Sequence, residues 1–139
     1  MIKKINYFLQ AILIYLFFLI GRILGIKLSR KIFSFLFSFM FPFFKSKKII
    51  EKNLKIFSQS MPDLEKKKII TSMWKNYGMT FIEYIFLDYF RKQNSHIIIN
   101  GETNLLNILK KNKPVIFVSG HFANFELMSM EITKKNINL

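Results

Sequence analysis

A histidine and a glutamate lie five positions apart near the end of the chain, in the segment 119–126 (SGHFANFE). Five positions on a regular helix rotate by about 500°, so the His121 and Glu126 side chains could not meet on one helix. If His121 lies in a turn and Glu126 in the first turn of a helix, the carboxylate can bind one imidazole nitrogen. That contact would fix the tautomer and raise the basicity of the ring. The spacing is therefore compatible with a general base and a carboxylate that positions it.

The same two residues have a simpler interpretation. A histidine in a turn needs no chemical role, and the helix dipole favours a glutamate at a helix start. His96, the other histidine, precedes a β-branched run, and we expect it to satisfy local hydrogen bonds. The chain has no cysteine, which excludes thiol nucleophiles and thiolate metal sites.

The segments around His121 alternate between two hydrophobic patterns. Residues 96–100 and 113–119 are apolar runs typical of strands, whereas residues 102–111 and 124–135 have helical periodicity. This order predicts an α/β fold with the start of a parallel βαβ core. Sites in parallel sheets lie beyond the carboxyl ends of the strands, where Gly120 and His121 would be.

An uncharged apolar run covers residues 5–21. As a helix it would measure about 25 Å, the short end of what crosses a hydrocarbon core of about 30 Å, and Lys4 and Arg22 could snorkel toward the headgroups. More basic residues follow the run than precede it, which places the downstream part in the cytoplasm. A cleaved signal peptide is the alternative, but no convincing small-residue cleavage site follows. We expect an uncleaved membrane anchor.

Helical patterns continue up to about residue 92. Residues 32–44 combine a phenylalanine-rich face with a narrow polar stripe, which predicts an interfacial amphipathic helix, with a buried core helix as the alternative. A basic helix is expected over 45–57, and a long amphipathic helix is expected to start at Pro62. The composition divides the chain into an anchor with its basic flank (1–31), an amphipathic helical region (32–92) and the first part of an α/β core (93–139).

Composition narrows the classes of function. The chain has 139 residues with 51% hydrophobic and 17% aromatic residues, which excludes disorder. Its net charge of +14 favours acidic partners or anionic surfaces. No nucleic-acid-binding motif occurs, so a nucleic-acid partner is not expected. A non-enzymatic, basic, membrane-tethered adaptor remains the alternative to an enzyme.

These features together resemble the lysophospholipid-acyltransferase-like superfamily, and most closely the lipid A biosynthesis acyltransferases that transfer lauroyl or myristoyl chains. The resemblance rests on the apolar run 5–21, an Asn-Leu pair in 52–54 (KNL), the segment 97–102 (IIINGE) and the block 121–126 (HFANFE). Ala123 stands where the family usually has glycine, and Phe125 where it has tryptophan. The glutamate at position 126, in place of an aspartate, favours the lipid A branch.

The resemblance implies transfer of a fatty acyl chain from acyl carrier protein to a hydroxyl of a lipid A precursor in lipopolysaccharide biosynthesis. It implies that His121 is the general base and that Glu126 orients it, and Asn124 would have a supporting role as a helix cap or substrate contact. Acyl carrier protein, an anionic glycolipid acceptor and the membrane would be the partners. No cofactor and no metal are expected.

The resemblance also implies an inner-membrane enzyme with one N-terminal anchor and a cytoplasmic catalytic part. Only two strands of the expected sheet are encoded before the chain ends. We therefore expect an apparently truncated core, with the remaining strands encoded downstream of Leu139.

Overall fold

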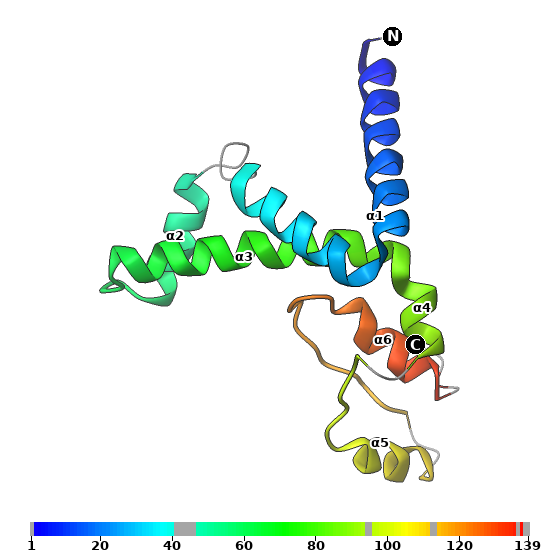
Figure 1. The fold of residues 1–139 in the computed structure, drawn as a ribbon. Coiled ribbons are helices and arrows are strands. Elements are labelled where there is room, and N and C mark those ends of the chain that lie inside the picture. The colour runs from blue at the N-terminus through cyan, green and yellow to red at the C-terminus, as the bar shows by residue number, and fades with distance from the viewer. Residues whose placement is uncertain (1, 41–46, 94–95, 112–113, 136, 138–139) are drawn as a thin grey trace. The chain divides into compact units, whose positions relative to one another are not determined.

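The computed structural model describes residues 2–40, 47–93, 96–111, 114–135 and 137, and it is built from helices (Figure 1). In chain order these are α1 (Ile2–Met40), α2 (Lys47–Phe57), α3 (Asp63–Glu83), a 3-10 turn η2 (Tyr84–Phe86), α4 (Leu87–Lys92), α5 (Glu102–Leu109) and α6 (Glu126–Thr133). The chain forms two compact units, Met1–Phe86 and Leu87–Leu139, which we call the N-terminal and the C-terminal unit. The three regions predicted from composition, 1–31, 32–92 and 93–139, stay a prediction.

The predicted βαβ core is wrong, because the described residues contain no β-strand. The apolar runs at 96–100 and 114–119 are irregular, with Ile98 89% and Val118 91% exposed; Lys113 lies outside the described residues. Strand propensity reflects how a side chain fits a paired, half-buried sheet surface, and the pairing must come from several strands. Two parallel segments with one intervening helix would leave both edges open and both faces poorly covered. The helices expected at 102–111 and 124–135 are present, slightly shortened, as α5 and α6.

Helix α1 joins the two N-terminal segments that were predicted separately, the anchor at 5–21 and the amphipathic helix at 32–44; residues 41–44 lie outside the described part. Its helical geometry breaks once, at Gly25, where φ is 71° and ψ is 165°. Only glycine adopts this conformation without strain. The buried Ser29 hydroxyl lies 2.7 Å from the carbonyl oxygens of both Gly21 and Gly25, and so supplies a partner for carbonyl groups near the break.

The two arms of α1 on either side of Gly25 share one aromatic cluster with α3. Phe17 from the first arm packs edge-to-face on Phe33 from the second arm, with ring centroids 5.6 Å apart. The Phe81 ring of α3 lies 5.9 Å from that of Phe33 and 5.3 Å from that of Phe37. Phe33 is only 2% exposed. The stripe of phenylalanines therefore serves in part as the core of the N-terminal unit.

Two glycines allow this close approach between the helices. A Cβ atom on Gly78 of α3 would lie 2.2 Å from the carbonyl oxygen of Phe33, which is backbone and cannot move aside cheaply. A Cβ atom on Gly21 would lie 2.5 Å from Ile82 Cδ1. An ion pair between Arg30 of α1 and the buried Glu83 of α3, with 2.9 Å between Nε and Oε1, adds a polar link.

Helix α1 is also long and apolar enough to cross a membrane. The span Lys3–Met40 contains an 18-residue window with a mean hydropathy of 2.2, of which only 6% is buried within the protein. A helix exposed along such an apolar stretch is more stable in lipid than in water. This observation favours a membrane anchor at the N-terminus.

Replacing Gly78 with alanine should destabilise the N-terminal unit by about 1–3 kcal/mol, because the added methyl group has no space against the Phe33 backbone. Alanine is the better helix former by about 1 kcal/mol, so helix propensity alone would give the opposite sign. Thermal unfolding in detergent measures the effect. Ser72→Ala, at an exposed position of the same helix, is the matched control and should change stability little. Equal melting temperatures for Gly78→Ala and the native protein would contradict the packing described above.

The protein should sediment with membranes after washes with high salt or alkaline carbonate, because the apolar span of α1 is held by the hydrocarbon core and not by charge. Immunoblotting measures how much of the protein stays in the membrane pellet and how much enters the supernatant. Release by either wash would show that the protein is attached only to the membrane surface.

Candidate active site

His121 lies in the irregular segment between α5 and α6, and its side chain is exposed to solvent. The imidazole packs edge-to-face against the ring of Phe125, with 4.1 Å between centroids and 72° between planes. A ring held in this way loses rotational freedom while its edge stays accessible. His121 is therefore placed where a substrate hydroxyl could reach it.

The backbone after His121 makes two abrupt changes of direction before α6 begins. The Phe122 N–H donates to the Gly120 carbonyl over 2.9 Å, and the exposed Phe122 ring folds over Gly120 so closely that a Cβ atom there would clash at 2.4 Å. Ala123 has a φ of 48°, in the left-handed region that glycine occupies more readily. A glycine at this position would adopt the same backbone with less strain than alanine.

Glu126 is the first residue of α6, two residues after the start expected from the sequence, and its side chain is half-buried. It lines a cavity of about 390 Å³ together with residues of α4 and α6, namely Leu87, Asp88, Arg91, Ser129, Met130 and Thr133. Within the described part of the chain, no hydrogen bond or ion pair links the Glu126 carboxylate to the His121 imidazole. Catalytic hydrogen bonds often tighten only when substrate binds, so this geometry leaves the predicted pairing open.

Asn124 is half-buried just before α6, and its backbone carbonyl oxygen accepts a hydrogen bond from the backbone N–H of Leu127 over 3.2 Å. The N-cap position itself belongs to Phe125, which makes no side-chain capping bond. Asn124 therefore supports the first turn of α6 through its backbone. A contact between its side chain and substrate stays a prediction.

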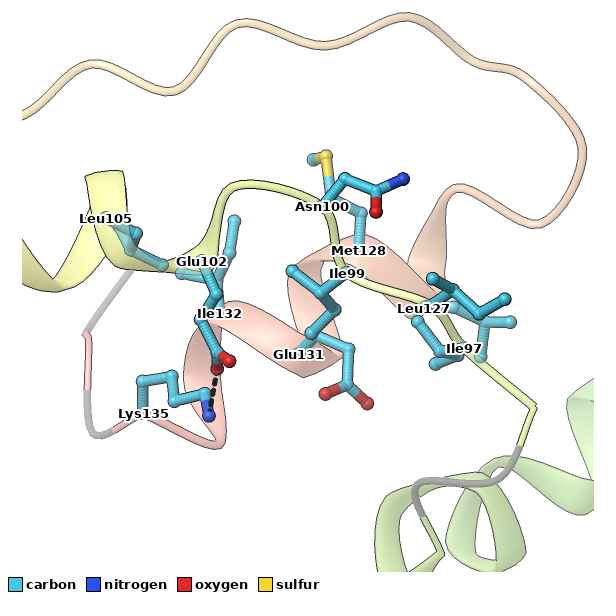
Figure 2. Close-up of a pocket in the computed structure, with 11 residues that line it drawn as sticks. Ile97, Ile99, Asn100, Glu102, Leu105, Leu127, Met128, Glu131, Ile132 and Lys135 are labelled. Carbon is cyan, nitrogen blue, oxygen red and sulfur yellow. Dashed lines mark ion pairs between the residues drawn. The ribbon is translucent and has the colours of Figure 1, made fainter.

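A second cavity, of about 360 Å³, lies between α6, α5 and the segment before α5 (Figure 2). Its walls are mostly aliphatic and include Ile97, Ile98, Ile99, Leu105, Leu127, Met128 and Ile132. An ion pair between Glu102 and Lys135 closes one end, as the dashed line in Figure 2 shows. The hydrogen bond and the charge of Glu102 raise the pKa of Lys135. The dimensions and the lining suit an apolar ligand with a polar group at one end.

His96 belongs to a different environment in the C-terminal unit. Its ring stacks on Tyr89, with centroids 5.5 Å apart, and packs edge-to-face on Phe90, at 4.3 Å. These aromatic contacts join the segment after α4 to α4 itself. The interpretation from the sequence, that His96 satisfies local hydrogen bonds, stays a prediction.

Sequence reasoning did not identify the partner of the His121 ring. An aromatic residue four positions after a histidine, such as Phe125, is the signal in the sequence that points to this contact. The proximity of Asp88 and Arg91 to Glu126 depends on the packing of α4 against α6, which local patterns cannot show. Among the described residues, no three His, Asp or Glu side chains gather closely enough to hold a metal ion.

Comparison with known protein families identifies a match over nearly the whole chain. The sequence model of a family described as bacterial lipid A biosynthesis acyltransferase matches residues 2–138. Neither a curated protein nor a solved structure matches the chain significantly. The match includes the helices of both units and the whole block from His121 to Glu126.

The left-handed backbone at Ala123 leads to a test of the site's architecture. Ala123→Val should destabilise the start of α6 by more than about 1 kcal/mol, because a β-branched side chain is strained at positive φ, whereas Ala123→Gly should be tolerated. Hydrogen exchange of the α6 peptide reports the change. Thr103→Val, a similar substitution at an exposed position of α5, is the control. If Ala123→Val left exchange unchanged, the left-handed conformation would be wrong.

Proposed function

The chain belongs to the bacterial lipid A biosynthesis acyltransferase family, and we propose that it transfers a fatty acyl chain from acyl carrier protein to a hydroxyl of a lipid A precursor. The observation that carries this proposal is the family match over residues 2–138, because it contains a histidine exposed at the entry to a helix that begins with glutamate.

In the proposed reaction, His121 takes the proton of the acceptor hydroxyl as that oxygen attacks the thioester carbonyl of the donor. The carbon–sulfur bond then breaks, and the imidazolium returns the proton to the departing thiolate. An ester and a free thiol result, so the proton is conserved and no redox partner is needed. The accessible edge of the His121 ring and its support by Phe125 are the features that suit this role.

Glu126 is the proposed positioning residue for His121. It is the first residue of α6, where an acidic side chain suits the positive end of the helix dipole. To hold the imidazole, the side chain turns from the cavity beside α4 toward His121 when substrate binds. An anionic partner of the imidazole favours its protonated form during the transfer.

The charge and the anchor suit the proposed substrates. Acyl carrier proteins are acidic and the acceptor is an anionic glycolipid, so a chain with a net charge of +14 attracts both. The apolar cavity in Figure 2 has walls suited to a hydrocarbon chain, and Leu127 and Met128, which line it, directly follow Glu126. No cofactor takes part in this proposal.

The proposed location is the inner membrane, with α1 as the anchor and the catalytic part in the cytoplasm. Arg22, Lys27, Arg30 and Lys31 follow the most apolar stretch of α1, whereas Lys3 and Lys4 precede it. The larger positive charge after the span favours a cytoplasmic position for the residues downstream of it. Both substrates are then within reach of His121.

Replacing His121 with alanine should lower acyl transfer by roughly 10²- to 10⁴-fold, because the general base is lost, and Glu126→Ala should lower it severely. The assay uses membranes of cells that express the protein's gene and lack other lipid A acyltransferases. Acyl carrier protein thioester and lipid A precursor are added, and the acylated product is detected by mass.

The control is His96→Phe, which removes the other imidazole and keeps an aromatic ring against Tyr89 and Phe90. It should retain activity. Near-native turnover by the His121 variant would contradict the catalytic assignment. A native protein without turnover would favour a non-enzymatic adaptor bound to the membrane.

A further inference from the structure

Helix α2 has two sharply different faces. At 100° per residue, the lysines at positions 48, 52 and 55 and Glu51 share one arc of the helix, and Ile49, Ile50, Leu54, Ile56 and Phe57 share the opposite arc. The polar arc therefore carries an excess of two positive charges. This pattern is typical of helices that lie in a membrane interface.

The apolar face of α2 is only partly covered in the N-terminal unit. Ile50 and Leu54 are half-buried, whereas Ile56 is 78% and Phe57 82% exposed, and Ile49 is exposed as well. On the helical wheel, Ile49 and Ile56 lie next to Lys52 at the edge of the polar arc, and Phe57 lies farther round the apolar arc. Apolar side chains flanked by lysines match the boundary between acyl chains and anionic headgroups.

We propose that the exposed apolar face of α2, formed by Ile49, Ile56 and Phe57, docks onto the anionic lipid surface of the membrane that α1 spans, with Lys52 and Lys55 of the neighbouring polar arc at the headgroups. Two observations select lipid as the occupant. The lysines match the negative charge of anionic headgroups, and α2 belongs to the same compact unit as the apolar helix α1. The protein is thus held by one spanning helix and one interfacial helix. This inference concerns the attachment of the N-terminal unit and does not rest on the chemistry of His121.

The absence of cysteine allows a direct test on the full chain. A single cysteine at Phe57→Cys or Lys48→Cys is labelled with an environment-sensitive fluorophore, and each protein is reconstituted into vesicles of phosphatidylcholine with or without phosphatidylglycerol. The two positions are nine residues apart and therefore lie on opposite sides of α2. Lipids with a quencher on the acyl chain report burial in the bilayer, and iodide reports exposure to water.

With phosphatidylglycerol present, the label at position 57 should be quenched several-fold more by lipid than the label at position 48, and its emission should shift to shorter wavelength. The label at position 48 should instead be quenched by iodide. Equal lipid quenching at both positions would overturn the proposal. Protection of position 57 from both quenchers would also overturn it, because the face would then be covered by protein.

A charge-reversal variant distinguishes binding to anionic lipid from binding to lipid of any charge. Lys52→Glu with Lys55→Glu should abolish the extra lipid quenching at position 57 in vesicles with phosphatidylglycerol. The matched reversal Lys67→Glu with Lys68→Glu, at exposed positions of α3, should leave it unchanged. If quenching at position 57 were the same with and without phosphatidylglycerol, the assignment to anionic lipid would be wrong. Circular dichroism of each variant verifies that the helices are retained.

Discussion

The close contact of α3 with the broken helix α1 is the constraint on which the N-terminal unit depends. The break at Gly25 lets both arms of α1 meet α3, and Gly78 lets the two backbones approach closely at Phe33. The cluster of phenylalanines from the two helices fills the space that this geometry creates. The most apolar part of α1 is hardly buried within the protein. The same helix can therefore contribute side chains to the core of the N-terminal unit and also lie in lipid.

The sequence predicts the helices of this protein well and its sheet wrongly. Helix signals are local: apolar residues recur at three- and four-residue steps, Pro62 precedes α3, and Gly101 precedes α5. Strands depend on partners that lie elsewhere, and the apolar runs around Ile98 and Val118 find none in the described residues. The family was recognised correctly because its motifs are short and do not depend on how the sheet is completed. The break in α1 lies at a glycine, a residue type that often interrupts helices. The apolar pattern continues across Gly25, however, so the sequence alone does not show that the helix breaks there.

At the candidate site, the sequence shows a histidine and a glutamate, His121 and Glu126, near the start of an expected helix. His121, for which the sequence suggests a turn, lies in an irregular segment that is followed by a left-handed residue at Ala123. The contact of the imidazole with Phe125 and the position of Glu126 beside Asp88 and Arg91 arise from side-chain packing, which the spacing of five residues does not determine. In the structure Glu126 lines the cavity beside α4, and a contact with the His121 ring is the alternative environment that we propose. The proposed mechanism requires the second one during transfer.

A double-mutant cycle on the acyl transfer rate tests most directly whether His121 and Glu126 act as one unit. The rates of the native protein, His121→Ala, Glu126→Ala and the double variant are compared in the same membranes. If Glu126 acts only by positioning His121, the double variant should be as slow as His121→Ala alone, because a carboxylate has no effect without the base that it orients. Independent losses that multiply in the double variant would contradict this account and would give Glu126 a separate role.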